Sequence, residues 1–225
     1  RSSRNIRQEN FMISVLLIGM GKFGRTLGEK LLGMGDEVMI VDKNEDVINA
    51  LAPRYTNALI ANCMTMENLE TMDIPSFDVC VVAIGDDFQS SLEITSLLKD
   101  FGAKKVVSRA CNDVQGKFLL RNGADDVVFA EKQMAEKLAV KYSANNIFDY
   151  IQLTSDYAIY EIPTPKSWEG KTIRDKGVRA KYNLNILAVK KGTNLTPLPD
   201  ADHVFSASER LIVMCRKSDI EKIVH

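Results

Sequence analysis

Short apolar runs alternate with amphipathic segments from residue 11 to residue 130. The run FMISVLLI at 11–18 contains no regular polar alternation, which is typical of a strand buried on both faces. Similar strand-like runs follow at 37–42, 58–61, 78–85, 105–110 and 125–130, and helical segments at 22–34, 45–52, 66–72, 87–101 and up to Leu120 separate them. This alternation predicts a six-stranded parallel sheet with helices on both faces.

The rhythm changes after one further helix, expected over residues 132–148. Strand-like runs then occur at 157–162, 185–190 and 210–215, separated by turn residues such as PTPKSWEG and TPLPDAD. We therefore expect a small second α+β domain over 149–225, a first domain over 12–148 that includes the linking helix, and a polar lead over 1–11.

The segment Gly19-Met20-Gly21-Lys22-Phe23-Gly24 fits the pattern G-x-G-x-x-G. It follows a buried strand and opens a helix, and Asp42 ends the next strand 18 residues after Gly24. In this context the glycines allow a tight turn, close approach of backbone amides to a pyrophosphate, and packing of helix on strand. The helix start offers unpaired N–H groups to phosphates, and Asp42 would accept hydrogen bonds from ribose hydroxyls, which disfavours NADP. The pattern predicts a Rossmann-like, doubly wound nucleotide-binding domain.

Charge and cysteine content narrow the classes of function. The 29 Lys and Arg residues nearly balance the 30 Asp and Glu residues, so no overall basic field favours nucleic acid as a partner. No apolar run approaches the roughly 20 residues that span a bilayer, and residues 1–10 lack the apolar core of a signal peptide, so we expect a cytoplasmic protein. Four widely spaced cysteines, Cys63, Cys80, Cys111 and Cys215, are expected to be buried, reduced thiols.

An NAD-dependent oxidoreductase is the first alternative function. Hydride transfer commonly needs a positioned proton donor and an enclosed substrate pocket. The chain has two histidines, His203 and His225, both in the small domain, and His203 is expected at the surface. We expect no enzymatic activity. A freestanding nucleotide or redox sensor is the second alternative.

Several ordered motifs, GMGKFG, VDKNE, IAN, VVAIG, NGADDVVFAEKQMA and RAKYNLNILAVK, resemble the regulatory subunits of Ktr and Trk potassium uptake systems. The resemblance extends over residues 12–225 and implies an RCK_N (TrkA-N) domain followed by an RCK_C (TrkA-C) domain. It also implies dimers joined through a crossover helix, an octameric ring beneath a membrane potassium-translocating subunit, and ATP, ADP, NAD or NADH in the nucleotide site.

The resemblance assigns roles to individual residues. Met20 and Phe23 would lie near the phosphate loop, and Lys22, where many relatives place Arg, would meet a phosphate. Asn62 would lie beside the adenine ring or simply form a strand-end turn. The residues expected on the opposite wall are Ala83, Ile84 and Gly85.

Two further residues are expected near the terminal phosphate. Arg109 would reach the phosphates from a neighbouring subunit. Glu131 would lie at the dimer interface near the γ-phosphate and a divalent cation such as Mg²⁺ or Ca²⁺, or would be a first-turn helix carboxylate. Asp86 and Asp87 are interpreted as the start of a helix and not as a metal site.

The small domain resembles a module that binds cyclic di-AMP between two protomers in some Gram-positive relatives. The matching positions are Val178, Arg179, Ala180, Asn185, Ile186 and Pro199, with Gly177 where several relatives carry Asp. Arg179 suits a phosphate and Asn185 an adenine edge. In the alternative interpretation Ile186, Leu187 and Val189 form a dimer-core strand and Arg179 pairs with an acidic neighbour.

Overall fold

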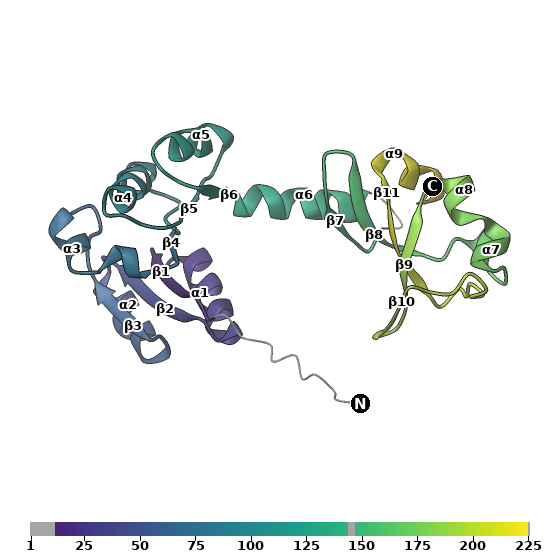
Figure 1. Cartoon of the computed structure of the whole chain (residues 1–225), viewed down its shortest axis with the longest axis horizontal. Coiled ribbons are helices and arrows are strands. Elements are labelled where there is room, and N and C mark those ends of the chain that lie inside the picture. Colours follow the sequence, from purple (N-terminus) through teal and green to yellow (C-terminus); the bar gives the residue numbers. More distant parts are fainter. Residues whose placement is uncertain (1–11, 144–146, 225) are drawn as a thin grey trace, which may run out of the picture. The chain divides into compact units, whose positions relative to one another are not determined.

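The computed structural model describes residues 12–143 and 147–224, which form two compact units (Figure 1). The first unit extends to Lys132 and the second begins at Gln133, so the division falls inside one helix, α6 (Ala130–Ser143). The predicted boundary after residue 148 differs from this division. Residues of α6 from Gln133 onward belong to the second unit, where the Lys137 ammonium pairs with Asp149 at 3.2 Å.

The first unit contains a six-stranded, fully parallel sheet in the order β3-β2-β1-β4-β5-β6. Its strands are β1 (Ser14–Ile18), β2 (Glu37–Asp42), β3 (Asn57–Ile60), β4 (Val79–Val82), β5 (Val106–Arg109) and β6 (Asp126–Val128). This confirms the predicted parallel sheet. The strand order reverses between β1 and β4, which is where an open parallel sheet binds its ligand.

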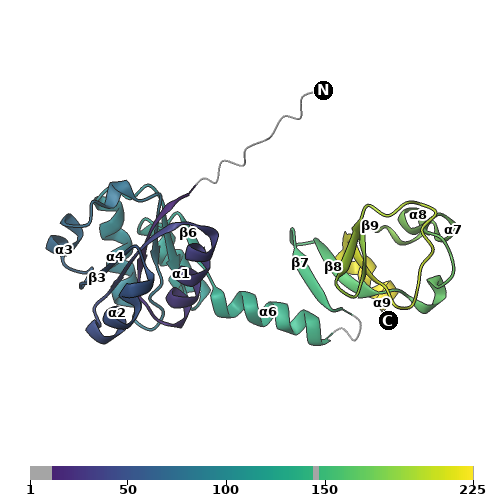
Figure 2. The ribbon, with the colours of Figure 1, turned by 90° about the horizontal axis from the view of Figure 1, so that it is seen from below.

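Helices connect these strands on both faces. They are α1 (Lys22–Met34), α2 (Glu45–Leu51), α3 (Met66–Glu70), α4 (Phe88–Asp100) and α5 (Asp113–Arg121), with short 3-10 turns η1 (Ala52–Arg54) and η2 (Ile74–Ser76). Alternate residues of β1 enter opposite cores: Leu17 packs toward α1 and α2, and Leu16 packs toward α3 and α4. Figures 1 and 2 show these two helix pairs on opposite sides of the sheet. The continuous apolar runs are therefore explained by burial on both faces.

Local signals set several helix starts. The Asn44 side chain accepts a hydrogen bond from the Val47 amide at 3.2 Å and caps α2. The Asp87 side chain accepts one from the Ser90 amide at 3.1 Å and caps α4, which confirms that Asp87 begins a helix. Amides in the first turn of a helix have no acceptor within the helix, and both side chains provide one.

The second unit contains a five-stranded antiparallel sheet in the order β10-β9-β11-β8-β7. Its elements are β7 (Asp149–Gln152), β8 (Tyr157–Pro163), η3 (Lys166–Trp168), α7 (Ile173–Lys176), α8 (Val178–Tyr182), β9 (Asn185–Lys191), β10 (Asn194–Pro197), β11 (Arg210–Arg216) and α9 (Lys217–Val224). This confirms a small α+β domain. Trp168, the single tryptophan, is 1% exposed and packs between the Tyr182 and Phe205 rings.

Three details differ from the predictions. The helix expected over 132–148 begins at Ala130. Phe148 lies outside this helix, because its amide donates to the Glu161 carbonyl at the entry to β7. Residues 144–146 lie outside the described part of the chain. Cys111 is exposed, in contrast to the other three thiols. His203 is half-buried, with Nε2 3.1 Å from Glu209 Oε2, because Glu209 also binds the Ser206 amide and holds this turn together.

Candidate functional site

The glycine-rich loop joins β1 to α1 at the carboxyl edge of the parallel sheet. The Gly19 amide donates to the Val41 carbonyl at 2.9 Å, and its φ of +95° belongs to the left-handed region that favours glycine. At Gly24 a Cβ would overlap the Gly19 carbonyl oxygen and lie 3.4 Å from the Ala83 Cβ. The loop therefore closes tightly only because both positions lack a side chain.

The start of α1 is open to an anion. Gly21 occupies the cap position with extended backbone, no side chain caps the helix, and its first turn contains no acidic residue. Backbone N–H groups and the positive end of the helix dipole therefore face the carboxyl edge, an arrangement that suits phosphate. Lys22 is exposed at this helix start and Met20 is buried beneath the loop.

Asp42 closes the loop from the end of β2. Its Oδ2 accepts a hydrogen bond from the Met20 amide at 2.7 Å, and its Oδ1 accepts one from the Asn44 amide at 2.9 Å. The carboxylate is half-buried and keeps acceptor capacity, since each carboxylate oxygen can accept more than one hydrogen bond. Asp42 therefore both shapes the phosphate loop and presents an acceptor at its edge.

Asn62 and Cys63 lie at the same edge, because the Ala61 amide donates to the Asp42 carbonyl at 3.1 Å. The Asn62 Oδ1 accepts from the Met64 amide at 3.1 Å, which is the strand-end turn expected as one alternative. Asn62 is exposed, and its side-chain nitrogen makes no hydrogen bond with the described residues. Burial, together with the nearby Asp42 charge, raises the pKa of the Cys63 thiol to about 12.

The wall opposite Asp42 follows β4. Ala83, Ile84 and Gly85 come directly after this strand, and a Cβ at Gly19 would lie 2.9 Å from Ile84 Cγ1. The loop is therefore packed against the end of β4, and the structure brings these residues together as predicted.

Arg109 ends β5 and points back to this wall. Its guanidinium lies against the Gly85 backbone, its Cζ is 5.7 Å from the centre of the Phe23 ring, and its Nη2 pairs with Glu131 of the same chain. The Glu131 backbone N–H, and after it the Arg109 guanidinium, hold the pKa of the Glu131 carboxyl below its usual range. Within the chain, Arg109 thus already reaches the loop.

Sequence reasoning missed Arg25, whose Nε donates to the Met20 carbonyl at 2.7 Å. This bond braces the loop from the first turn of α1. A basic residue close after G-x-G-x-x-G was the available signal, but its orientation depends on the folded loop. Cys111 was also misjudged: its thiol donates to the Gly85 carbonyl at 3.1 Å, and it is exposed because it lies in the turn after β5 and not within a strand.

The second candidate site lies on α8 and the start of β9. Arg179 Nε donates to Asn185 Oδ1 at 2.8 Å, so Arg179 pairs with an amide and not with the acidic neighbour of the alternative interpretation. Val178 is 3% exposed and belongs to the domain core. Ala180 is exposed, and Ile186 and Pro199 are half-buried.

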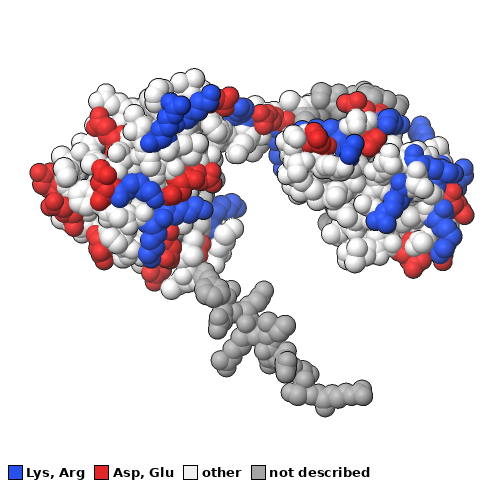
Figure 3. All heavy atoms as spheres, turned by 45° about the horizontal axis from the view of Figure 1, so that its top comes forward, with Lys and Arg blue, Asp and Glu red and all other residues white. Residues whose placement is uncertain are grey.

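Positive side chains are frequent on the two short helices next to this surface. The basic residues of α7 are Arg174 and Lys176, and those of α8 are Arg179 and Lys181. Figure 3 shows Lys and Arg atoms on the surface of the second unit. Arg174 pairs with Asp202 at 2.8 Å, whereas Lys176 donates to the Ser167 carbonyl at 2.9 Å and therefore keeps its charge uncompensated there. The positive charges on this surface favour an anion.

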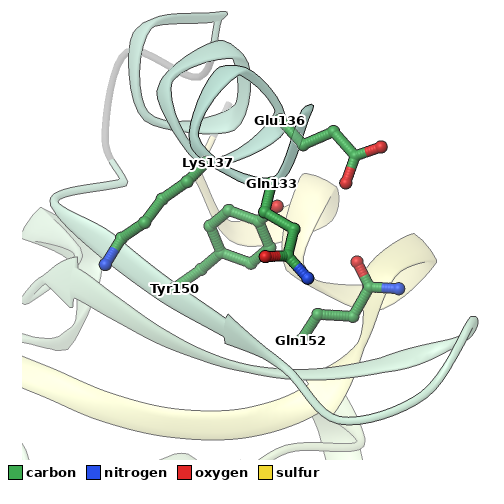
Figure 4. Close-up of a pocket in the computed structure, with 5 residues that line it drawn as sticks. All are labelled: Gln133, Glu136, Lys137, Tyr150 and Gln152. Carbon is green, nitrogen blue, oxygen red and sulfur yellow. The ribbon is translucent and has the colours of Figure 1, made fainter. Parts of the chain in front are cut away.

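A separate pocket of about 330 Å³ lies inside the second unit, between α6 and β7 (Figure 4). Its lining residues are Gln133, Glu136, Lys137, Tyr150 and Gln152. Gln133 and Gln152 approach each other across the opening, whereas Glu136 points away from the Tyr150 ring. No predicted site residue lines this pocket. Over residues 12–143 and 147–224, no group of three His, Cys, Asp or Glu side chains is placed to hold a metal ion.

The geometry defines the class of protein: a Rossmann-like domain with a glycine-rich loop after β1 and an acidic residue at the end of β2, followed by a small α+β domain. Comparison with known proteins is consistent with this class. Residues 15–130 match the TrkA-N domain family, and residues 157–225 match the TrkA-C domain family.

Curated relatives cover nearly the whole chain. The chain is 35% identical to Ktr system potassium uptake protein A of Bacillus subtilis over 206 residues. The matched region covers 92% of this chain and 93% of that protein. Ktr system potassium uptake protein C of the same organism is 34% identical with the same coverage. The chain therefore belongs to the Ktr and Trk family of potassium uptake proteins with TrkA-N and TrkA-C domains.

A solved structure extends the likeness to the fold. The GsuK channel bound to NAD superposes with a TM-score of 0.70 at 18% identity, over 96% of this chain and 40% of that chain. At this identity the match concerns the fold of the chain and not its ligand. In the part of the chain that the structure describes, no helix is both long and apolar enough to cross a membrane.

Proposed function

We propose that this chain is the cytoplasmic, nucleotide-binding regulatory subunit of a potassium uptake system. ATP, ADP, NAD or NADH occupies the carboxyl edge of the parallel sheet and changes the shape of a homo-oligomer without being consumed. The observation that carries the proposal is the Asp42 carboxylate bonded to the Met20 amide at 2.7 Å, beside an uncapped helix start. This combination provides a ribose acceptor next to a phosphate-binding turn.

We propose the following roles for the residues of this site, which the geometry supports. Gly19, Gly21 and Gly24 shape the phosphate loop, and Lys22 and Phe23 line it. Asp42 holds the ribose and Asn62 faces the adenine. The opposite wall consists of Ala83, Ile84 and Gly85, with Arg109 at the phosphate end.

Two apolar surfaces support an oligomer with two kinds of interface. On α5, Val114 and Phe118 are 61% and 45% exposed, and on α6, Met134 and Leu138 are 57% and 44% exposed. Each pair is spaced by four residues and therefore shares one helix face. Dimers formed through α6 that associate again through α5 give a closed ring, in line with the octamer expected for this family.

The family also suggests the partners. The named relatives are potassium uptake proteins, and the chain has no helix suited to a membrane span among its described residues, so it acts through a membrane potassium-translocating subunit. Ligand binding shifts the ring only by the difference in affinity between its two shapes. A tenfold ratio, about 1.4 kcal/mol, is sufficient to redistribute two nearly balanced shapes.

Further ligands belong to the same proposal. Glu131 supplies a carboxylate oxygen, the ligand type that Mg²⁺ and Ca²⁺ prefer, and a single carboxylate fits such an ion only together with phosphate oxygens or a second chain. Cyclic di-AMP binds the small domain between two protomers through Val178, Arg179, Ala180, Asn185, Ile186 and Pro199. The buried position of Val178 restricts it to supporting Arg179 from the core.

Isothermal titration calorimetry tests the central site. The purified chain is titrated with ATP, ADP, NAD and NADH, and Asp42→Ala is expected to weaken binding at least about tenfold, because the ribose acceptor and a bond that shapes the loop are both lost. Asp100→Ala is the matched control, since Asp100 is exposed at the other end of α4. Unchanged affinity of Asp42→Ala would remove the proposed site.

Two measurements test the rest. Native mass spectrometry reports the ring size together with any retained nucleotide, and copurification with a membrane subunit tests the partner. A freestanding sensor would bind the same nucleotides without that partner. Substrate-dependent oxidation of NADH by the purified chain would support the oxidoreductase alternative instead.

A further inference from the structure

The Arg109 side chain is held in a fixed place at the phosphate end of the site. It is 16% exposed, and its guanidinium lies on the backbone of Gly85, where an added Cβ would be 2.6 Å from Arg109 Cζ. Its Cζ lies 5.7 Å from the ring centre of Phe23, a residue of the phosphate loop. The absence of a side chain at Gly85 and the Phe23 ring together place the guanidinium beside the loop.

The hydrogen bonding of this guanidinium is incomplete within the chain. Its Nη2 pairs with Glu131 Oε1, whereas its Nε is buried and has no acceptor among the described residues. A guanidinium presents donors in a planar fork that matches a carboxylate or a phosphate. The Arg109 fork is therefore engaged by one carboxylate oxygen and retains an unused buried donor.

Glu131, the partner of Arg109 in this ion pair, is much more exposed to solvent than Arg109 is. Its side chain is 64% exposed in the first turn of α6, where the helix start favours its negative charge. An exposed carboxylate can leave an ion pair at low cost, because water solvates it after departure. Arg109 is fixed and Glu131 is free to move, so a competing anion would displace Glu131.

We propose that Glu131 is an internal competitor for phosphate at the nucleotide site. In the nucleotide-free chain it occupies Arg109, and the terminal phosphate of a bound nucleotide displaces it from the guanidinium. The displaced carboxylate then becomes available to a divalent cation. This inference rests on the proposed nucleotide-binding function and adds that Glu131 determines how strongly the site distinguishes ligands by their terminal phosphate.

The competition predicts whether replacing Glu131 strengthens or weakens ligand binding. If Glu131 only helped to bind the ligand, its removal would weaken binding or leave it unchanged. If Glu131 competes with the ligand, its removal strengthens binding whenever no divalent cation is present. Chelating divalent cations during the measurement therefore separates the two roles.

Calorimetric titrations with ADP and ATP in EDTA test the proposal. Glu131→Gln is expected to increase the affinity about threefold or more for the ligand whose phosphate reaches Arg109, and Arg109→Ala is expected to lower it about tenfold. The double variant should match Arg109→Ala, because no pair is left to compete. Glu136→Gln, the same change at an exposed position of α6, is the control and should bind as the unmodified chain does. Unchanged or weaker binding by Glu131→Gln in EDTA would overturn the proposal.

A second measurement needs no nucleotide. The Glu131 carboxyl is titrated by carbon-13 NMR in the unmodified chain and in Arg109→Ala, with circular dichroism confirming that the variant is folded. The midpoint is expected at lower pH when Arg109 is present; equal midpoints would show that the pair does not form in solution and would overturn the proposal. If the unmodified chain binds no nucleotide, the proposed function fails, and the NMR titration still reports separately on the pair.

Discussion

The two candidate ligand sites are held in place by different parts of the chain. At the edge of the parallel sheet, Asp42 accepts from the Met20 amide, and the loop residue Gly19 donates to the Val41 carbonyl. On the small domain, Arg179 contacts Asn185 through one side-chain bond. The first site is built by the backbone of buried strands, whereas the second depends on exposed side chains of a helix and a strand end.

In our proposal, this difference means that the first site draws its groups from one chain and that the second is shared by two protomers. The first candidate site combines a glycine-rich turn, the Asp42 carboxylate and the Arg109 guanidinium, each next to a strand end. The second candidate site combines the Arg179 guanidinium and the Asn185 amide on one surface. We expect a second protomer to provide its opposite wall. Nucleotide binding should therefore survive in a monomer, and cyclic di-AMP binding should not.

The largest expected effect comes from the glycine at the closest approach in the first site. Gly24→Val places a branched Cβ on the Gly19 carbonyl oxygen and should lower the free energy of unfolding by about 3 kcal/mol or more. Urea denaturation followed by circular dichroism measures this. Gly33→Ala is the control: a Cβ there meets nothing within 4 Å and should stabilise the same helix by about 0.5–1 kcal/mol. A loss below about 1 kcal/mol for Gly24→Val would show that the loop can open.

Cysteine labelling sharpens the contrast between the sites. Cys111 is exposed and bonded to the Gly85 carbonyl, whereas burial raises the pKa of Cys215 in the small domain to about 11. Iodoacetamide should therefore modify Cys111 first in the folded chain, and a nucleotide should slow this reaction about tenfold by covering the first site. Peptide mass spectrometry identifies the labelled thiol. Cyclic di-AMP should give no protection, and faster labelling of any other cysteine would contradict the burial pattern.

A smaller effect concerns the helix cap beside the first site. The Ser90 hydroxyl, followed by the Ser90 amide, holds the pKa of Asp87 below its usual value of 3.8. A carboxyl with a depressed folded pKa stabilises the protein above its unfolded pKa, and this stabilisation is lost as the pH falls through the folded pKa.

Asp87→Asn should therefore lower Tm at pH 7, and the difference from the unmodified chain should close as the pH falls below about 4. Differential scanning calorimetry between pH 7 and pH 3 follows both curves. Asp86→Asn, an exposed neighbour that caps no helix, serves as the control. A difference that persists unchanged at low pH would exclude the charge of Asp87 as its cause.

The smallest expected effect belongs to the second site. Arg179→Ala removes one exposed hydrogen bond to Asn185 and should change the free energy of unfolding by less than about 0.5 kcal/mol. It should leave nucleotide affinity unchanged and abolish any binding of cyclic di-AMP, as measured by calorimetry. Lys191→Ala, at an exposed position at the end of β9, is the matched control. A large loss of stability would show that Arg179 is part of the domain structure.

Sequence patterns predicted the parallel sheet well because its strands are buried on both faces and read as continuous apolar runs. They missed β7 and β10, which are edge strands with mostly exposed residues, and they missed the short helices α7 and α8. Edge strands bury little apolar surface, so their composition resembles that of loops.

The candidate site was predictable in part for a related reason. Spacing alone placed Asp42 at the end of β2, but its bond to the Met20 amide depends on how β1 and β2 pair. The predicted position of Arg109 at a strand end was informative, whereas its contact with Glu131 joins residues 22 positions apart through the fold. The exposure of Cys111 likewise depends on where β5 ends.

The single tryptophan gives this molecule a built-in optical reporter. Trp168 is buried among aromatic rings of the small domain, and the first unit contains none. Its fluorescence therefore reports melting of the TrkA-C unit alone, even while the TrkA-N unit is intact. A dye on Cys111 reports unfolding of the first unit. A single sample therefore distinguishes stepwise from concerted unfolding of the two units.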